Sequence, residues 1–148
     1  MKERNVHTFI GCEDEYEESK IVVFGAPFDS TTSFRPGTRF ASATMRNESF
    51  GIETYSPYQD KDLEDINVFD AGDLELSFGN SESALKDIED ATAEILEDGK
   101  IPFMIGGEHS VTLGSVRAAA EKYPDLHIIQ FDAHTDLREE YLDQYYSH

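Results

Sequence analysis

The sequence predicts an α/β fold in which helices cover both faces of a mostly parallel sheet, a three-layer α/β/α arrangement. Two observations support this fold class. Short continuous apolar runs, typical of strands buried on both faces, recur along the chain and end at glycine or aspartate. The later runs alternate with segments of helical apolar spacing, in the order strand, helix, strand, helix, strand. This alternation with short connections is typical of βαβ units.

The first half of the chain contains two of the predicted strands. Residues 1–20 are charged and are expected to form an acidic surface lead-in. The apolar run at 21–24 predicts the first strand, and the segment at 29–37, rich in Ser, Thr, Pro and Gly, predicts a long loop. A short helix is expected at about 41–49, and a second strand at 66–69.

The clearest predicted helix spans about residues 82–98. Its apolar face consists of Leu85, Ile88, Ala91, Ile95 and Leu96. Ser81 or Ser83 can cap its start, and Gly99 stands where a glycine commonly ends a helix. The helix therefore has predicted start and stop signals as well as a face to bury.

Two more strands and one helix follow. A strand is predicted at 101–105, a helix at 111–123 with Ser110 as N-cap, and a last strand at 126–131. No linker divides the chain after the lead-in, so residues 21–148 are expected to belong to a single domain.

The composition restricts the class of partner. Lys plus Arg number 12 and Asp plus Glu number 31, which gives a formal net charge of −19. Such a charge argues against nucleic acid or an anionic membrane as partner and favours a small cationic molecule. The single cysteine excludes an intrachain disulfide, and no apolar run is long enough to cross a bilayer, so a cytoplasmic protein is expected.

Two polar segments follow predicted strands and carry residues suited to catalysis. Gly-Gly-Glu-His-Ser occupies 106–110, and Asp-Ala-His-Thr-Asp occupies 132–136. In open α/β sheets, sites form outside the carboxyl ends of the strands. Because neighbouring parallel strands lie about 4.8 Å apart, we expect His109 to reach the second segment.

The second segment predicts a metal site. Asp132, His134 and Asp136 alternate, so an extended backbone places them on one side. Carboxylates and imidazole suit a fairly hard divalent ion such as manganese, and two ions about 3.5 to 4 Å apart could share them. Alternatively, Asp132 caps the next turn and His134 is an ordinary loop histidine. Glu108 is expected either to orient an imidazole or to be an exposed acid at a helix start.

These motifs resemble those of a known enzyme family. The segments at 106–110 and 132–136 are similar to the first two metal-binding motifs of the ureohydrolases, the arginase family. Gly-Ala-Pro-Phe-Asp at 25–29 and Arg-Pro-Gly-Thr-Arg at 35–39 resemble the agmatinase-type members. The resemblance implies an arginase-like fold that is incomplete in this chain, because family members are much longer and carry a later Asp-X-Asp motif.

The resemblance also implies a binuclear manganese site. By position, His109, Asp132 and Asp136 would bind one Mn²⁺ ion, and Asp132 would bridge to a second ion held by His134. Two ions lower the pKa of bound water to about 7, which supplies a nucleophile at neutral pH. The implied reaction is hydrolysis of a guanidinium group, with agmatine giving putrescine and urea. His148 falls near the family's histidine for proton transfer or substrate contact.

Other interpretations stay open. Another ureohydrolase activity, that of an arginase, guanidinobutyrase or formiminoglutamase, is compatible, because the residues that read the substrate tail come mostly after His148. A non-catalytic metal-binding fragment fits a chain without the later Asp-X-Asp motif. A mononuclear deacetylase-like hydrolase also uses an Asp-X-His, but it has no role for His109 or Asp136. A full-length family member is expected to form a homotrimer or homohexamer.

Overall fold

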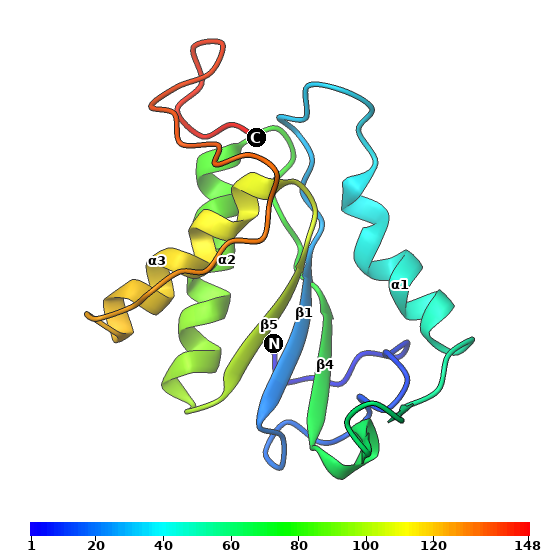
Figure 1. Cartoon of the computed structure of the whole chain (residues 1–148). Helices are drawn as coiled ribbons and strands as arrows, with labels where there is room; N and C mark the ends of the chain where they lie inside the picture. The colour runs from blue at the N-terminus through cyan, green and yellow to red at the C-terminus, as the bar shows by residue number, and fades with distance from the viewer.

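A three-stranded parallel sheet forms the centre of the computed structural model, which describes residues 1–148 (Figure 1). The strands lie in the order β4-β1-β5, with β1 at Ile21–Ala26, β4 at Val68–Asp73 and β5 at Ile101–Gly106. The register pairs the last residue of β1 with the last residue of β5, so the carboxyl ends of the strands meet at one edge. The predicted parallel sheet is confirmed.

Helices lie on both sides of this sheet (Figure 1). Helix α2 at Ser81–Glu97 and helix α3 at Thr112–Lys122 pack against each other on one face. Helix α1 at Ala41–Ser49 lies on the other face (Figure 1). The arrangement is the three-layer α/β/α sandwich that the sequence predicts.

The main core lies between the sheet and α2. Val22 and Phe24 of β1 are fully buried, and they cluster with Phe69 of β4 and Ile95 of α2. The apolar positions that predicted the inner face of α2 are all buried in the structure, from Leu85 to Leu96. Helical periodicity therefore identified the buried face correctly.

The ends of α2 differ in how well they were predicted. Its N-cap is Asn80, whose side-chain oxygen accepts the Ser83 N–H at 3.1 Å, so the prediction of Ser81 or Ser83 as cap is wrong. Asn80 directly precedes Ser81, and its side-chain oxygen can accept a backbone N–H as a serine hydroxyl would. The other end is as predicted, because Gly99 has a φ of 74° and donates to the Leu96 carbonyl at 3.0 Å.

The remaining elements are short. A two-stranded antiparallel pair joins β2 at Tyr55–Ser56 to β3 at Lys61–Asp62. The 3-10 helices are η1 at Thr38–Phe40, η2 at Leu63–Asp65 and η3 at His109–Val111. None of the helices combines the length and the apolar character that a bilayer crossing demands.

Part of the lead-in belongs to the core, contrary to the expectation of a surface segment. Cys12 and Tyr16 are 5% and 4% exposed. The Tyr16 hydroxyl donates to Asp98 at 2.7 Å, just after α2. The acidic residues around these two positions concealed their apolar role in the sequence.

The strand predicted at residues 126–131 is not formed. This segment has no backbone ladder to β5, and Ile129 and Phe131 are 80% and 97% exposed. A strand is stabilised by ladder hydrogen bonds and by burial of its side chains, and this segment has neither.

Candidate functional site

The turn after β5 places His109 at the carboxyl edge of the sheet. Gly107 donates its N–H to the Ala26 carbonyl at 3.0 Å, and Glu108 donates its N–H to the Phe28 carbonyl at 2.8 Å. A Cβ atom at Gly107 would overlap the backbone of Phe28, so only glycine permits this approach. His109 then begins η3. Gly107 thus lets the turn that carries His109 pack against the segment that follows β1.

Both polar motifs line one pocket, of about 390 Å³, at this edge. His109 lines it from the end of β5, while Asp132, His134 and Asp136 reach it from the later segment. His148 lines the same pocket. Further lining residues include Ser33, Arg138, Glu140 and Tyr141. The structure therefore brings together every predicted site residue except Glu108, although the strand before Asp132 is absent.

The candidate ligands are close to one another without converging on a point. His109 Nε2 lies 3.9 Å from Asp136 Oδ2, and His134 Nδ1 lies 4.0 Å from Asp132 Oδ1. Ligands of a single ion lie about 3 Å apart, because each sits about 2.1 Å from the metal. Consequently no three His, Cys, Asp or Glu side chains are close enough to hold an ion in this arrangement. The donor types suit manganese. The distance between His109 Nε2 and Asp136 Oδ2 would have to shorten by about 1 Å to reach the spacing of two ligands of one ion.

Asp132 makes the local turn that was the alternative to metal binding. Its Oδ1 atom accepts the His134 N–H at 2.8 Å. This hydrogen bond lowers the pKa of the Asp132 carboxyl; burial opposes the shift, and the charges of His109 and His134 favour it. The carboxylate is therefore anionic at neutral pH, which is the form that binds a cation.

Glu108 lies in neither of its two predicted environments. Its 2% exposure excludes a surface acid at the start of a helix. Its carboxylate accepts the Thr31 N–H at 2.8 Å, the Thr31 hydroxyl, and the Ser110 hydroxyl at 2.5 Å, and its partners include no imidazole. Ser110 is accordingly not the predicted helix cap, because its hydroxyl is bonded to Glu108 and the N-cap of α3 is Val111.

The loop at 29–37 is also part of the site, which the sequence did not predict. Ser33 lines the pocket, and the buried Asp29 accepts the Gly37 N–H at 2.6 Å and the Arg39 guanidinium at 3.0 Å. The available signal was an aspartate directly after a buried strand and before a loop without a ladder of its own. The N–H groups of such a loop need acceptors, and a carboxylate supplies them.

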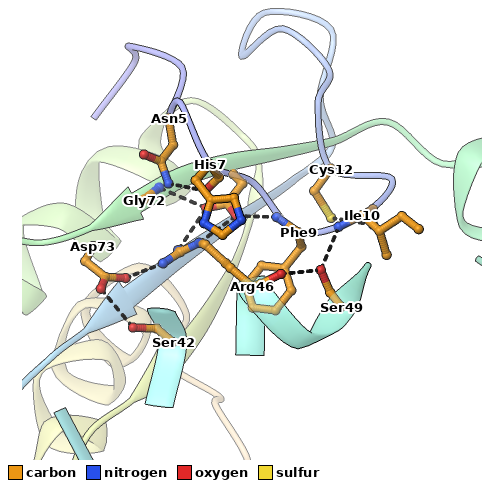
Figure 2. A network of polar contacts seen from close by, with 11 residues as sticks. Asn5, His7, Phe9, Ile10, Cys12, Ser42, Arg46, Ser49, Gly72 and Asp73 are labelled. Atoms are coloured by element: carbon orange, nitrogen blue, oxygen red, sulfur yellow. Dashed lines mark hydrogen bonds and ion pairs between the residues drawn. The ribbon is translucent and has the colours of Figure 1, made fainter. Parts of the chain in front are cut away.

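A second polar cluster, which the sequence did not predict, is centred on Arg46 (Figure 2). The guanidinium of this buried residue bonds to Asp70 at 2.8 and 2.9 Å and to Asp73 at 2.5 Å. Ser42 donates to Asp73 at 2.9 Å. Both aspartates of the Asp-Ala-Gly-Asp segment at 70–73 are thus bonded to Arg46. Their spacing also differs from that of the alternating ligands at 132–136.

Comparison with protein families and with curated proteins gives one consistent set of relatives. A family model described as the arginase family matches residues 19–148. The agmatinase of Bacillus subtilis is 50% identical over 140 residues, which cover 95% of this chain and 48% of that protein. The agmatinase of Bacillus anthracis is 49% identical with the same coverage. The chain therefore spans about half the length of the curated relatives that it matches.

Solved structures show the same similarity. A provisionally assigned agmatinase of Clostridium difficile is 59% identical with a TM-score of 0.87, over 90% of this chain and 48% of that one. The agmatine ureohydrolase of Thermoplasma volcanium is 37% identical with a TM-score of 0.90, over 97% of this chain and 48% of that one. The fold described above is thus the one adopted by the corresponding half of these proteins.

Proposed function

Because this chain belongs to the arginase family, we propose that it functions in the hydrolysis of a guanidinium group, with agmatine converted to putrescine and urea. The observation that carries the proposal is the meeting of two polar motifs in one pocket at the carboxyl edge of the sheet. The 49% and 50% identity to agmatinases supports the choice of agmatine among guanidines.

The charge of the pocket supports a cationic substrate. Asp132, Asp136 and Glu140 line it, with Arg138 as the basic side chain among them. An acidic cleft in a chain of net charge −19 raises the local concentration of a cation such as agmatine. His148 lines the same cavity, where an imidazole can contact the substrate or transfer a proton.

We also propose manganese as the metal. In this proposal His109, Asp132 and Asp136 hold one ion, while Asp132 and His134 hold another. Bound divalent ions supply a polarised water of lowered pKa to such a reaction. The protein contributes anionic oxygens and imidazole nitrogens, which suit manganese better than a thiol-preferring ion. The distance between His109 Nε2 and Asp136 Oδ2 is 3.9 Å, so a modest side-chain movement would let both residues bind the same ion.

Two observations favour a second candidate function, a metal-binding module without turnover. No three potential ligands converge in the described structure, and the chain spans about half of its relatives. In this alternative the pocket binds a cation weakly and no guanidine is hydrolysed. Assembly into a homotrimer or homohexamer is a further proposal, which sedimentation equilibrium tests directly.

Urea release tests the leading proposal. The chain would be assayed with Mn²⁺ both alone and as a fusion in which residues 1–148 are followed by the second half of the Bacillus subtilis relative. Agmatine, arginine and guanidinobutyrate would be compared, and an Asp132→Ala fusion serves as the inactive control. We expect urea from agmatine with the fusion. A clear preference for arginine or guanidinobutyrate contradicts the substrate, and manganese binding without urea release in both proteins favours the module.

A further inference from the structure

The loop at 29–37 is closed on itself by a buried carboxylate. Asp29 accepts the Gly37 N–H at 2.6 Å and the Arg39 Nη1 at 3.0 Å. The side chain of Asp29 is 3% exposed and that of Arg39 is 43% exposed, so the carboxylate is shielded from water while the guanidinium that it binds stays partly in solvent. Asp29 therefore fixes the shape of the loop, but it does not fix the position of the loop relative to β5.

Glu108 supplies that second restraint. Its carboxylate accepts hydrogen bonds from the backbone N–H of Thr31 at 2.8 Å and from the Thr31 hydroxyl, so two donors of one loop residue bind it. Its own backbone N–H bonds to the Phe28 carbonyl at 2.8 Å. On its other side, the carboxylate accepts the Ser110 hydroxyl at 2.5 Å. Glu108 thus connects the loop to the residues on both sides of His109.

Thr31 extends this connection to the last residues of the chain. Its hydroxyl oxygen accepts the backbone N–H of His148 at 2.8 Å while its proton is donated to Glu108. One continuous series of hydrogen bonds therefore runs from Ser110 through Glu108 and Thr31 to His148. The pocket walls formed by Ser33 and His148 are tied by it to the turn that carries His109.

We propose that Glu108 is a positioning residue, which acts through Thr31 to hold the Ser33 and His148 walls of the pocket against the His109 turn. The inference rests on the proposed function, because it assigns Glu108 a role in shaping that same pocket. A buried carboxylate that loses its donors is costly, and a neutral amide in its place cannot accept from all of them. Glu108 is therefore sensitive to an isosteric change that leaves its size intact.

Four variants separate this role from a general effect on stability. Glu108→Gln keeps the side-chain volume and removes the charge. Thr31→Val keeps the branched shape and removes the hydroxyl, whereas Thr31→Ser keeps the hydroxyl and should restore the wild-type behaviour. Thr92→Val is the matched control, since this buried threonine bonds to Ser115 at 2.9 Å between α2 and α3, away from the pocket.

Amide hydrogen exchange of the chain is the first measurement. In Glu108→Gln we expect the amides of residues 31–33 to exchange at least about tenfold faster, as expected when a hydrogen bond to a charged group is lost. In Thr31→Val the His148 amide should lose protection. Thr31→Ser and Thr92→Val should leave both regions as in the wild type. Unchanged exchange at 31–33 in Glu108→Gln, or an equal increase throughout the chain, overturns the proposal.

The second measurement is manganese affinity by calorimetry in the fusion protein. Glu108→Gln and Thr31→Val should each weaken binding by about tenfold, the double variant should weaken it by less than the product, and Thr92→Val should not change it. Equal affinities in Glu108→Gln and the wild type contradict the positioning role. Absence of manganese binding or urea release in the wild type counts against the proposed function instead, and amide exchange then decides the present inference by itself.

Discussion

Arg46 and Asp70 form a bidentate ion pair inside the protein, with Arg46 Nε 2.8 Å from Asp70 Oδ2 and Arg46 Nη2 2.9 Å from Asp70 Oδ1. Arg46 is 3% exposed and Asp70 is fully buried. The pair joins α1 to β4, and Asp70 Oδ2 also accepts the Phe9 N–H at 3.0 Å from the lead-in. The lead-in, α1 and β4 therefore meet at the Asp70 carboxylate.

Replacing Arg46 with methionine should destabilise the protein by about 3 to 5 kcal/mol, because it leaves a buried carboxylate without its counter-charge. Urea denaturation measures the change. Lys86→Met is the matched control, since Lys86 pairs with Glu89 and Asp90 on the surface and its loss should cost less than about 1 kcal/mol. Similar losses for the two variants would show that the buried pair is not a special source of stability.

The periodic elements of this fold were predictable from the sequence, and the polar contacts between segments were not. Helix α2 follows from its apolar spacing and its terminal glycine, both of which are local properties. The partnership of Arg46 with Asp70 joins residues 24 positions apart, and no local pattern distinguishes a buried arginine from a surface one. The strand predicted at 126–131 failed for the same reason, because its formation depends on pairing rather than on its own composition.

The same distinction between local patterns and long-range contacts applies to the candidate site. His109, Asp132, His134 and Asp136 could be found because each follows an apolar run at a spacing that suits metal ligation. The role of Glu108 could not, because its partner Thr31 lies 77 positions away in a loop without periodicity. Sequence spacing thus identified residues of one motif as a group, while contacts between distant loops required the structure.

Gly107→Ala should destabilise the protein by about 1 to 3 kcal/mol, because the added methyl group overlaps the Phe28 backbone and forces the turn away from β1. The His109 turn would move with it, so manganese affinity should fall as well. Thermal unfolding and calorimetry measure the two effects. In Gly51→Ala the new Cβ lies 3.3 Å from the Glu48 carbonyl, and only a small change is expected. Unaltered stability in Gly107→Ala would show that the turn accommodates a side chain.

The free energy of unfolding should fall with rising pH above about 9 because of Cys12. Burial raises the pKa of this thiol from 9.0 to about 12, with further contributions from Asp70, Glu13 and Asp14. The unfolded thiol releases its proton near its ordinary pKa while the folded thiol retains it, so folding is favoured below that value and loses about 1.4 kcal/mol per pH unit above it. The loss ends as pH passes through the folded pKa.

Urea denaturation of the wild type and of Cys12→Ala at pH 8 and at about pH 10 checks this dependence. The two proteins differ only at this side chain, so the difference between their two stabilities isolates the thiol. We expect the advantage of the wild type to shrink at the higher pH. Parallel behaviour of the two proteins would mean that Cys12 ionises equally in the folded and unfolded states.

Manganese content should respond differently to the loss of His109 and the loss of Asp132. In the proposed site His109 serves one ion, whereas Asp132 bridges both, so His109→Ala should lower occupancy of one ion and Asp132→Ala should remove both. Elemental analysis of the dialysed fusion protein measures manganese per chain. His127→Ala is the control, because this exposed histidine bonds to the Asp125 carbonyl at 2.8 Å and does not line the site pocket. Equal manganese content in the wild type and Asp132→Ala would contradict the bridging role, and an equal loss in His109→Ala and His127→Ala would remove the special position of His109 at the end of β5.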